Sequence, residues 1–332
     1  MNSSSPFLNS SNSSALPSFF YSSSGLLFVY NAFSLYTQPL IIVLGTIGCV
    51  LNIVILTQKP LCSSSCAFYF RCVSINDLFV IYFIALLQWL SDQYEIDPTT
   101  YSQFYCKTQN YFVFIFYTLG RYFTVLACAD RFCTSSPNSR LRKVAKLQIA
   151  YYSTALTVII NLIVYSHVLL NYTIISVPSS FGSVCTPGST MRDYQFSALF
   201  VLIYLCFLPP ALMCLFCLLT IWNIIQQGQR VTSIGDTSSI RRRKREQELV
   251  KMLFVFVITN LLFTLPYACV YLYVIYNPYL PIEFRYTLNL CHLIVNFNSA
   301  SSFYVYTMST RGYRNEVLKM IEKVKTIIQF RR

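Results

Sequence analysis

Seven long apolar segments constrain this chain more than any other feature of its sequence. Each is long enough to cross the roughly 30 Å of hydrocarbon in a bilayer as a helix. The runs are continuous and do not alternate with polar residues, so they indicate helices and not barrel strands. The sequence therefore predicts an all-α membrane protein with a seven-transmembrane helix bundle. We expect its spans at 36–58, 67–91, 104–129, 147–170, 196–225, 249–276 and 286–309, the last being the weakest because it is rich in Asn, Ser and Tyr.

The composition and the ends of the chain agree with a membrane protein. Only 11% of the 332 residues are charged, whereas about a quarter is usual in a soluble protein. We expect a disordered segment over 1–35, the bundle over 36–309 and a short basic tail over 310–332. Apolar residues recur in the tail at helical spacing between basic ones, which predicts an amphipathic helix on the membrane surface. They are Tyr313, Val317, Met320, Ile321, Val324 and Ile328.

Positive charge is unevenly divided between the two sets of loops. Of the 25 lysines and arginines, all but Lys107, Arg121, Arg192 and Arg285 fall in segments on one side of the predicted bundle. The positive-inside rule makes that side cytoplasmic, which puts the N-terminus outside the cell and the C-terminus inside. The basic cluster at 241–245 predicts contact with anionic lipid of the inner leaflet. No basic patch with interleaved aromatics stands on a soluble module, so we expect no nucleic-acid partner.

Sequons and two cysteines lie on the predicted extracellular side. Glycosylation is possible there, and disulfides persist in that oxidising environment. Cys106 begins the third span and Cys185 lies between the fourth and fifth. We favour a disulfide between them over two unrelated thiols, because few other cysteines lie on that side. The four sequons begin at Asn2, Asn9, Asn12 and Asn171.

A set of short motifs follows the spans in order. Asp130-Arg131-Phe132 ends the third span, with Arg131 standing 25 residues after Cys106. Single residues mark the other spans: Asn52, Asp77, Pro210, Pro266 and Tyr306, the two prolines being expected helix kinks. With these motifs at this spacing, the chain resembles a rhodopsin-like (class A) G-protein-coupled receptor over about residues 36–322.

Departures from that pattern occur in the later spans. Thr264 stands two residues before Pro266, where the family usually has tryptophan, and Ser302-Phe303 replaces its Asn-Pro. In having Phe303 at this position after Asn298-Ser299-Ala300, the seventh span resembles that of invertebrate receptors for FMRFamide-type neuropeptides. The resemblance thus implies a receptor that binds an extracellular ligand, a neuropeptide in the narrower reading.

The family resemblance also implies a switch that activates a heterotrimeric G protein. Arg131 would pair with Asp130 and with an acid at the foot of the sixth helix, Glu246 or the nearby Glu248. Breaking these contacts would let the sixth helix move outward, with Tyr306 as a further switch residue. The plainer alternative is a solvated ion pair on the surface, worth about 0–1 kcal/mol.

Two charged residues fall in the middle of predicted spans. Asp77 would bind sodium together with Asn298 and Ser299 if it follows the family, or it is a protonated structural carboxyl. Arg121 lies in the third span, where an arginine costs roughly 2.5–3.5 kcal/mol to insert, so it should have a partner.

We expect a polar relay from Arg121 to Asn260 that extends, where the guanidinium can reach it, to Asp77. In that case Arg121 supplies the positive charge and sodium binding is lost. The alternative is that Arg121 only satisfies local carbonyls. Asn52 completes the expected buried polar network.

The ligand pocket is predicted partly from what it lacks. Val113 stands where amine receptors have an aspartate, so we expect no monoamine ligand. Asn296 stands where opsins have the lysine that binds retinal, so we expect no retinal either. Aromatic residues remain for the pocket: Phe114, Tyr117, Tyr267 and Tyr271. Acids would surround its mouth and attract a basic peptide; they are Asp92, Glu95, Asp97, Asp193 and Glu283.

Two other classes of protein compete with a receptor. The two histidines, His167 and His292, are far apart in sequence, and no phosphate loop or catalytic triad stands out, so we expect neither an enzyme nor a cofactor. A transporter or channel is the remaining alternative, although no paired repeats support it.

Overall fold

The computed structural model describes residues 16–58, 62, 64–94, 96–176, 183–230, 237–276 and 283–309, and parts of 313–329. Within these ranges, side chains are described except at 16–27, 227–249, 283–286 and a few single positions. The remaining residues are outside the description that follows.

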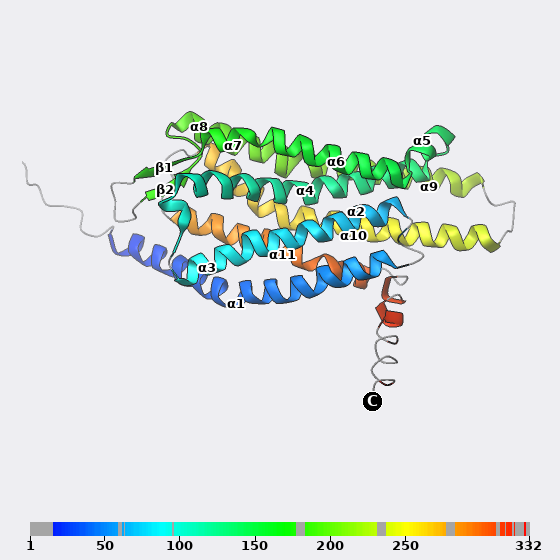
Figure 1. Ribbon diagram of the computed structural model, residues 1–332, viewed down its shortest axis with the longest axis horizontal. Helices are drawn as coiled ribbons and strands as arrows, with labels where there is room; N and C mark the ends of the chain where they lie inside the picture. Colours follow the sequence, from blue (N-terminus) through cyan, green and yellow to red (C-terminus); the bar gives the residue numbers. More distant parts are fainter. Residues whose placement is uncertain are drawn as a thin grey trace, which may run out of the picture.

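Seven membrane spans lie side by side along the long axis of the molecule (Figure 1). Four are single helices and three include a break or a change of helix type within the described segments. In order they are α1 (Leu16–Thr57); α2 (Ser65–Phe79) with α3 (Leu87–Tyr94); α4 (Gln103–Ser135); α6 (Leu147–Val164) with α7 (Ser166–Asn171); α8 (Met191–Val201) with α9 (Leu208–Arg230); α10 (Thr237–Tyr276), which contains a proline; and α11 (Glu283–Ser309).

Small elements mark the two ends of the bundle. Strands β1 (Thr173–Ser176) and β2 (Ser183–Thr186) pair antiparallel, with Ile174 opposite Cys185. This defines what we call the hairpin end. The short helix α5 (Ser139–Val144) lies at the opposite end, here called the α5 end (Figure 1).

Six of the described helices are long and apolar enough to cross a membrane. The exception is α11, the span predicted to be weakest. It has 27 residues, and its polar side chains face inward: Asn296 and Ser302 are buried, while Phe297 and Tyr304 are exposed. Its low hydropathy therefore reflects a polar inner face, and it packs between α1 and α10. The prediction of a seven-helix bundle is confirmed.

The first helix begins earlier than expected. α1 starts at Leu16, so residues 16–35 are helical and the predicted disorder is wrong for that part of the segment; residues 1–15 are outside the described part of the chain. Tyr30 and Ser34 explain the extension, because both are buried and their hydroxyls donate to the Asp92 carboxylate on α3 at 2.6 and 2.7 Å.

Two spans change their winding near the middle of the bundle. In the fifth, the π-helical segment Leu202–Phe207 ends two residues before Pro209, the first of the pair Pro209-Pro210. It relieves the hydrogen bonding that the prolines interrupt. In the second, Val80–Leu86 is also π-helical, but no proline accompanies it and sequence reasoning missed it. Pro266 lies inside the sixth span, α10.

The chain turns away from the bundle axis after α11 (Figure 1). Residues 313–315 and 317–320 are helical. Tyr313 is buried, Val317 and Met320 pack against the core, and Arg314 and Lys319 are exposed. Because these apolar residues recur every three or four positions, the described part of the tail has the amphipathic pattern predicted.

Candidate functional site

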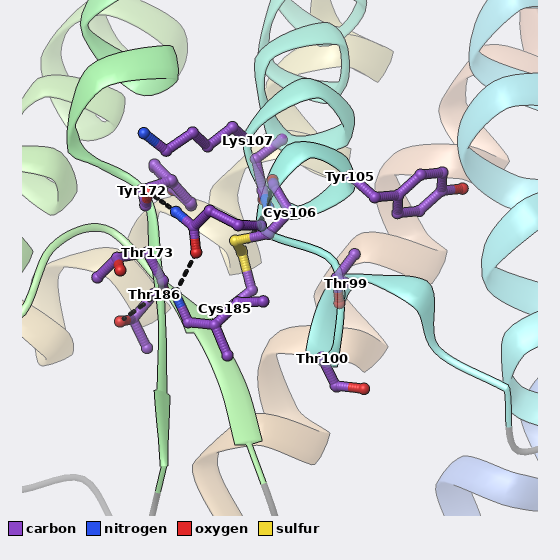
Figure 2. Close-up of a disulfide and its surroundings, with 12 residues drawn as sticks. Thr99, Thr100, Tyr105, Cys106, Lys107, Tyr172, Thr173, Cys185 and Thr186 are labelled. Carbon is purple, nitrogen blue, oxygen red and sulfur yellow. Dashed lines mark hydrogen bonds between the residues drawn. A yellow bond between two sulfur atoms is a disulfide. The ribbon is translucent and has the colours of Figure 1, made fainter.

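A disulfide joins Cys106 at the start of α4 to Cys185 on β2, with 5.8 Å between the two Cα atoms. Figure 2 shows the bond between the two sulfur atoms. Gln103, about one turn before Cys106 on α4, reinforces this connection. Its amide donates to the Tyr172 carbonyl at 2.8 Å and accepts from the Ile174 amide at 3.0 Å. Asn110 on α4 also donates to Cys185 Sγ at 3.3 Å. The hairpin is therefore attached to the third span by a disulfide and by hydrogen bonds, and the predicted disulfide is confirmed.

A cavity of about 950 Å³ opens beneath the hairpin. Its walls come from the second, third, fifth, sixth and seventh spans, from the segment 96–100 between the second and third spans, and from both strands of the hairpin. This volume is at the upper end of the range for small-molecule sites, roughly 300–1,000 Å³. The argument below uses these lining residues: Asp92, Asp97, Val113, Phe114, Tyr271 and His292.

The charges on the described cavity wall are negative. Asp92 and Asp97 line the cavity, and no lysine or arginine does so among the described residues. Both carboxylates are also held in place: Asp92 accepts from Tyr30 and Ser34, and Asp97 accepts from the Thr99 hydroxyl at 2.6 Å. Two fixed carboxylates on a wall whose described lining holds no lysine or arginine favour a positively charged ligand.

A layer of hydrogen-bonded and stacked rings lies below the cavity. The Tyr117 hydroxyl donates to Asn296 at 2.8 Å, and the Tyr267 hydroxyl donates to Tyr271 at 3.1 Å. The His292 ring packs against both Tyr117 and Tyr267. This layer connects the third, sixth and seventh spans directly under the cavity.

A much smaller cavity, of about 20 Å³, lies deeper in the bundle. Charged and polar side chains gather around it: Asp77, Arg121, Asn260, Asn298 and Ser299. The Asn298 amide donates to the Asn260 carbonyl oxygen at 2.8 Å, and Ser299 and Ser302 interact with the Asp77 carboxyl. The residues predicted to form a buried network thus meet at one place, with the exception of Asn52.

A buried ion pair lies at the α5 end. Arg131 Nη2 is 2.9 Å from Asp130 Oδ2, and the Ser65 hydroxyl donates to Asp130 Oδ1 at 2.6 Å. Both side chains of the pair are less than a tenth exposed. This burial rules out the alternative of a solvated surface pair.

Residues 48–309 match the model of the 7 transmembrane receptor (rhodopsin family). The chain belongs to this family. No curated protein matches it at a significant level. The protein is therefore a multi-pass receptor of the plasma membrane that signals through G proteins, and membership in a family of receptors disfavours the transporter, channel and enzyme alternatives.

The receptor places only half of the predicted pocket residues on the cavity wall. Val113, Phe114 and Tyr271 line it. Tyr117, Tyr267 and Asn296 do not; they form the layer of rings beneath. Helical periodicity predicted correctly that these residues face inward. It could not determine their depth relative to a floor formed by other side chains.

Other cavity residues of the receptor were missed. His292 lines the cavity, although the sequence gives it no motif that predicts a place in the pocket. Tyr172 lines the wall behind the hairpin, where burial raises the pKa of its phenol and keeps it protonated. A residue just outside a predicted span gives no hydropathy signal, which explains why Tyr172 was overlooked.

The expected relay from Arg121 to Asn260 is wrong in its direct form. Arg121 Nη1 donates to the Tyr117 carbonyl at 2.6 Å, and Nη2 donates to the Thr264 hydroxyl at 3.3 Å. Asn260 is instead paired with Asn298. The sixth-span partner is therefore Thr264, one helical turn from Asn260, at the position where the family usually has tryptophan.

Asn52 also differs from its prediction. Its side-chain oxygen accepts a hydrogen bond from the Tyr313 hydroxyl, and it does not line the small cavity. Tyr306 is fully buried between Phe70, Phe256 and Tyr313. Asn52 thus attaches the first span to the segment after the seventh.

Several predicted residues are outside the described part of the receptor. Asn2, Asn9, Asn12 and Glu95 are among them, and the side chains of Glu246, Glu248 and Glu283 are not described. Asp193 is described, but it caps α8 through Thr190 and does not line the cavity. Asn171 is exposed at the hairpin end.

Proposed function

We propose that the receptor binds an extracellular peptide with a basic group and activates a heterotrimeric G protein by outward movement of α10. The observation that supports this most strongly is the large cavity that carries two fixed carboxylates and no basic residue among its described lining. A basic side chain or amino terminus of a peptide can enter it, while the rest of the peptide contacts the hairpin.

The cavity also supports a peptide over smaller amines. At about 950 Å³ it is larger than a monoamine needs, and Val113 provides no carboxylate in the third span for an ammonium group. Asp92 and Asp97 lie instead on α3 and in the segment that follows it, at the hairpin end of the bundle. Negative charge at this end suits a ligand that extends out of the bundle.

The α5 end supports the signalling half of the proposal. Burying the Asp130–Arg131 pair costs free energy unless its geometry is good. Removing one partner leaves the other as a buried charge without compensation. We propose that ligand binding changes this pairing and releases α10, with Glu246 or Glu248 as the second partner of Arg131.

The orientation and membrane contacts complete the proposal. The N-terminal segment and the hairpin end face outward, where Asn2, Asn9, Asn12 and Asn171 can carry glycans. The 310–332 tail and the basic cluster at 241–245 face the cytoplasm and anionic lipid. The distribution of lysine and arginine supports this arrangement.

A screen of neuropeptides followed by charge-neutral variants tests the ligand proposal. Cells expressing the receptor are exposed to peptides with and without basic residues, and guanine-nucleotide exchange is measured. For an active basic peptide, Asp92→Asn and Asp97→Asn should each raise the half-maximal concentration by tenfold or more, since about 1.4 kcal/mol corresponds to tenfold.

Asp193→Asn is the matched control, because it removes an acid from the same end of the bundle but outside the cavity. It should leave the half-maximal concentration unchanged. Equal shifts for all three variants would indicate a general surface charge effect. Activation only by acidic or neutral ligands would refute the proposal.

A further inference from the structure

The charges buried inside this receptor form two groups. Four charged side chains are buried in the described part of the chain: Asp77, Arg121, Asp130 and Arg131. The last two form the ion pair at the α5 end. The Asp77 carboxyl and the Arg121 guanidinium remain, on the wall of the same cavity of about 20 Å³. A lone buried charge is strongly unfavourable, so each needs compensation.

The family resemblance suggests a sodium ion as the partner of Asp77, and the side chains around the cavity test that idea. Asn298 and Ser299 supply two of the expected oxygen ligands. A third is missing, because Gly120 stands where the family usually has serine. A Cβ atom on Gly120 would come within 3.0 Å of the Asn76 amide nitrogen, which is held by the Phe116 carbonyl. The space for a serine hydroxyl is therefore occupied.

Arg121 is the stronger objection to sodium. Its guanidinium is anchored by the Tyr117 carbonyl and the Thr264 hydroxyl. An arginine guanidinium carries a positive charge in proteins generally. A sodium ion in so small a cavity would face this fixed positive charge at close range and with little solvent screening. The residues do not fit a sodium ion.

We propose that Arg121 is the built-in counter-ion of Asp77 and that this receptor neither binds nor responds to sodium at this site. The hydrogen-bonding groups left over on the cavity wall agree with a water molecule in the remaining space. Arg121 Nε is a buried donor without a partner, and Asn298 Oδ1 is a buried acceptor without one. A volume of about 20 Å³ accepts a water, which needs about 10–15 Å³, and the water can join the two groups.

This arrangement connects the counter-ion to the moving helix. Thr264 belongs to α10, so outward movement of that helix would change the hydrogen bond that anchors Arg121. The inference depends on the geometry of the bundle and not on the proposed peptide. It can therefore fail while the ligand proposal stands, and the reverse is also true.

Thermal unfolding of the purified receptor, without ligand or G protein, tests the proposal. The unfolding midpoint is compared in sodium chloride and in choline chloride at about 0.15 M, so that screening is equal. We expect no sodium-dependent shift in the unmodified receptor. Arg121→Leu should create one, with sodium raising the midpoint, and Arg121→Lys should remain insensitive because it keeps a cation.

A double-variant cycle tests the pairing itself. Asp77→Asn and Arg121→Leu should each lower the midpoint in choline chloride. Together they should lower it by less than the sum, since no charge is left unpaired. Should Arg121→Leu fail to fold, the double variant, which buries neither charge, should restore folding. Arg71→Leu is the control, because it removes an arginine from α2 that lies over the Phe68 ring and outside the cavity.

Three outcomes would overturn the proposal. The first is an unmodified receptor stabilised by sodium, with the effect lost in Asp77→Asn. The second is additive destabilisation by the two substitutions. The third is a double variant that folds no better than Arg121→Leu. Each would show that Arg121 does not compensate Asp77.

Discussion

At the scale of single residues, Ser65 determines how Asp130 presents its carboxylate. It occupies one oxygen while Arg131 occupies the other. A hydrogen bond to a charged group contributes about 1.5–3 kcal/mol. We therefore expect Ser65→Ala to weaken the inactive pairing and raise basal nucleotide exchange several-fold, measured in membranes without ligand and normalised to surface expression.

Ser74→Ala provides the matched control for this prediction. Ser74 is on the same helix and is also buried, but its hydroxyl donates to the Phe70 carbonyl one turn away and not to the ion pair. Its loss should leave basal exchange unchanged. If both alanine variants behave alike, Ser65 has no specific effect on the ion pair.

At the scale of elements, the hairpin depends on two kinds of attachment to α4. A disulfide typically contributes about 2–4 kcal/mol and a neutral hydrogen bond about 0.5–1.5 kcal/mol. Cys185→Ser should thus lower the unfolding midpoint more than Gln103→Ala does. Reducing agent should lower the midpoint of the unmodified receptor but not that of Cys185→Ser.

Cys269→Ser is the control for the disulfide prediction, since Cys269 is free and exposed on α10. Its unfolding midpoint should match that of the unmodified receptor in both redox conditions. An equal loss in both cysteine variants would indicate a general effect of thiol removal and contradict the attachment model.

The elements also show what the sequence could predict. Hydropathy placed the spans, and α6 begins at Leu147 as expected. The free-energy cost of placing an arginine in the middle of a span identified Arg121 as a residue that needs hydrogen-bond or ionic partners. The identity of those partners depends on the direction of each side chain and on its depth in the bundle. For this reason the sequence pointed to Asn260, whereas the observed partner is Thr264. The Asn52–Tyr313 contact was missed because it joins segments far apart in sequence, and single-span patterns carry no information about such pairs.

At the scale of the whole molecule, polar groups form successive levels between the two ends. The large cavity lies at the hairpin end, the layer of rings and the Asp77–Arg121 cavity follow, and the Asp130–Arg131 pair lies at the α5 end. Arg121 belongs to the middle level and contacts both Tyr117 and Thr264. A ligand that moves the rings therefore has a continuous polar route toward α10.

This order has a functional meaning only if the hairpin end faces outward, and Asn171 allows a direct test. In a receptor with Asn2, Asn9 and Asn12 changed to Gln, glycan at Asn171 should remain as a mobility shift removed by an endoglycosidase. Thr173→Ala destroys the remaining sequon and should abolish the shift. Thr173→Ser preserves it and should not, which separates glycosylation from any disturbance of β1. Epitope tags at the two termini test the same orientation independently. Antibody binding to each tag is measured before and after the cells are permeabilised, and the C-terminal tag should be detected only afterwards. A C-terminal tag accessible in intact cells would place the Asp130–Arg131 pair outside, where no G protein could reach it.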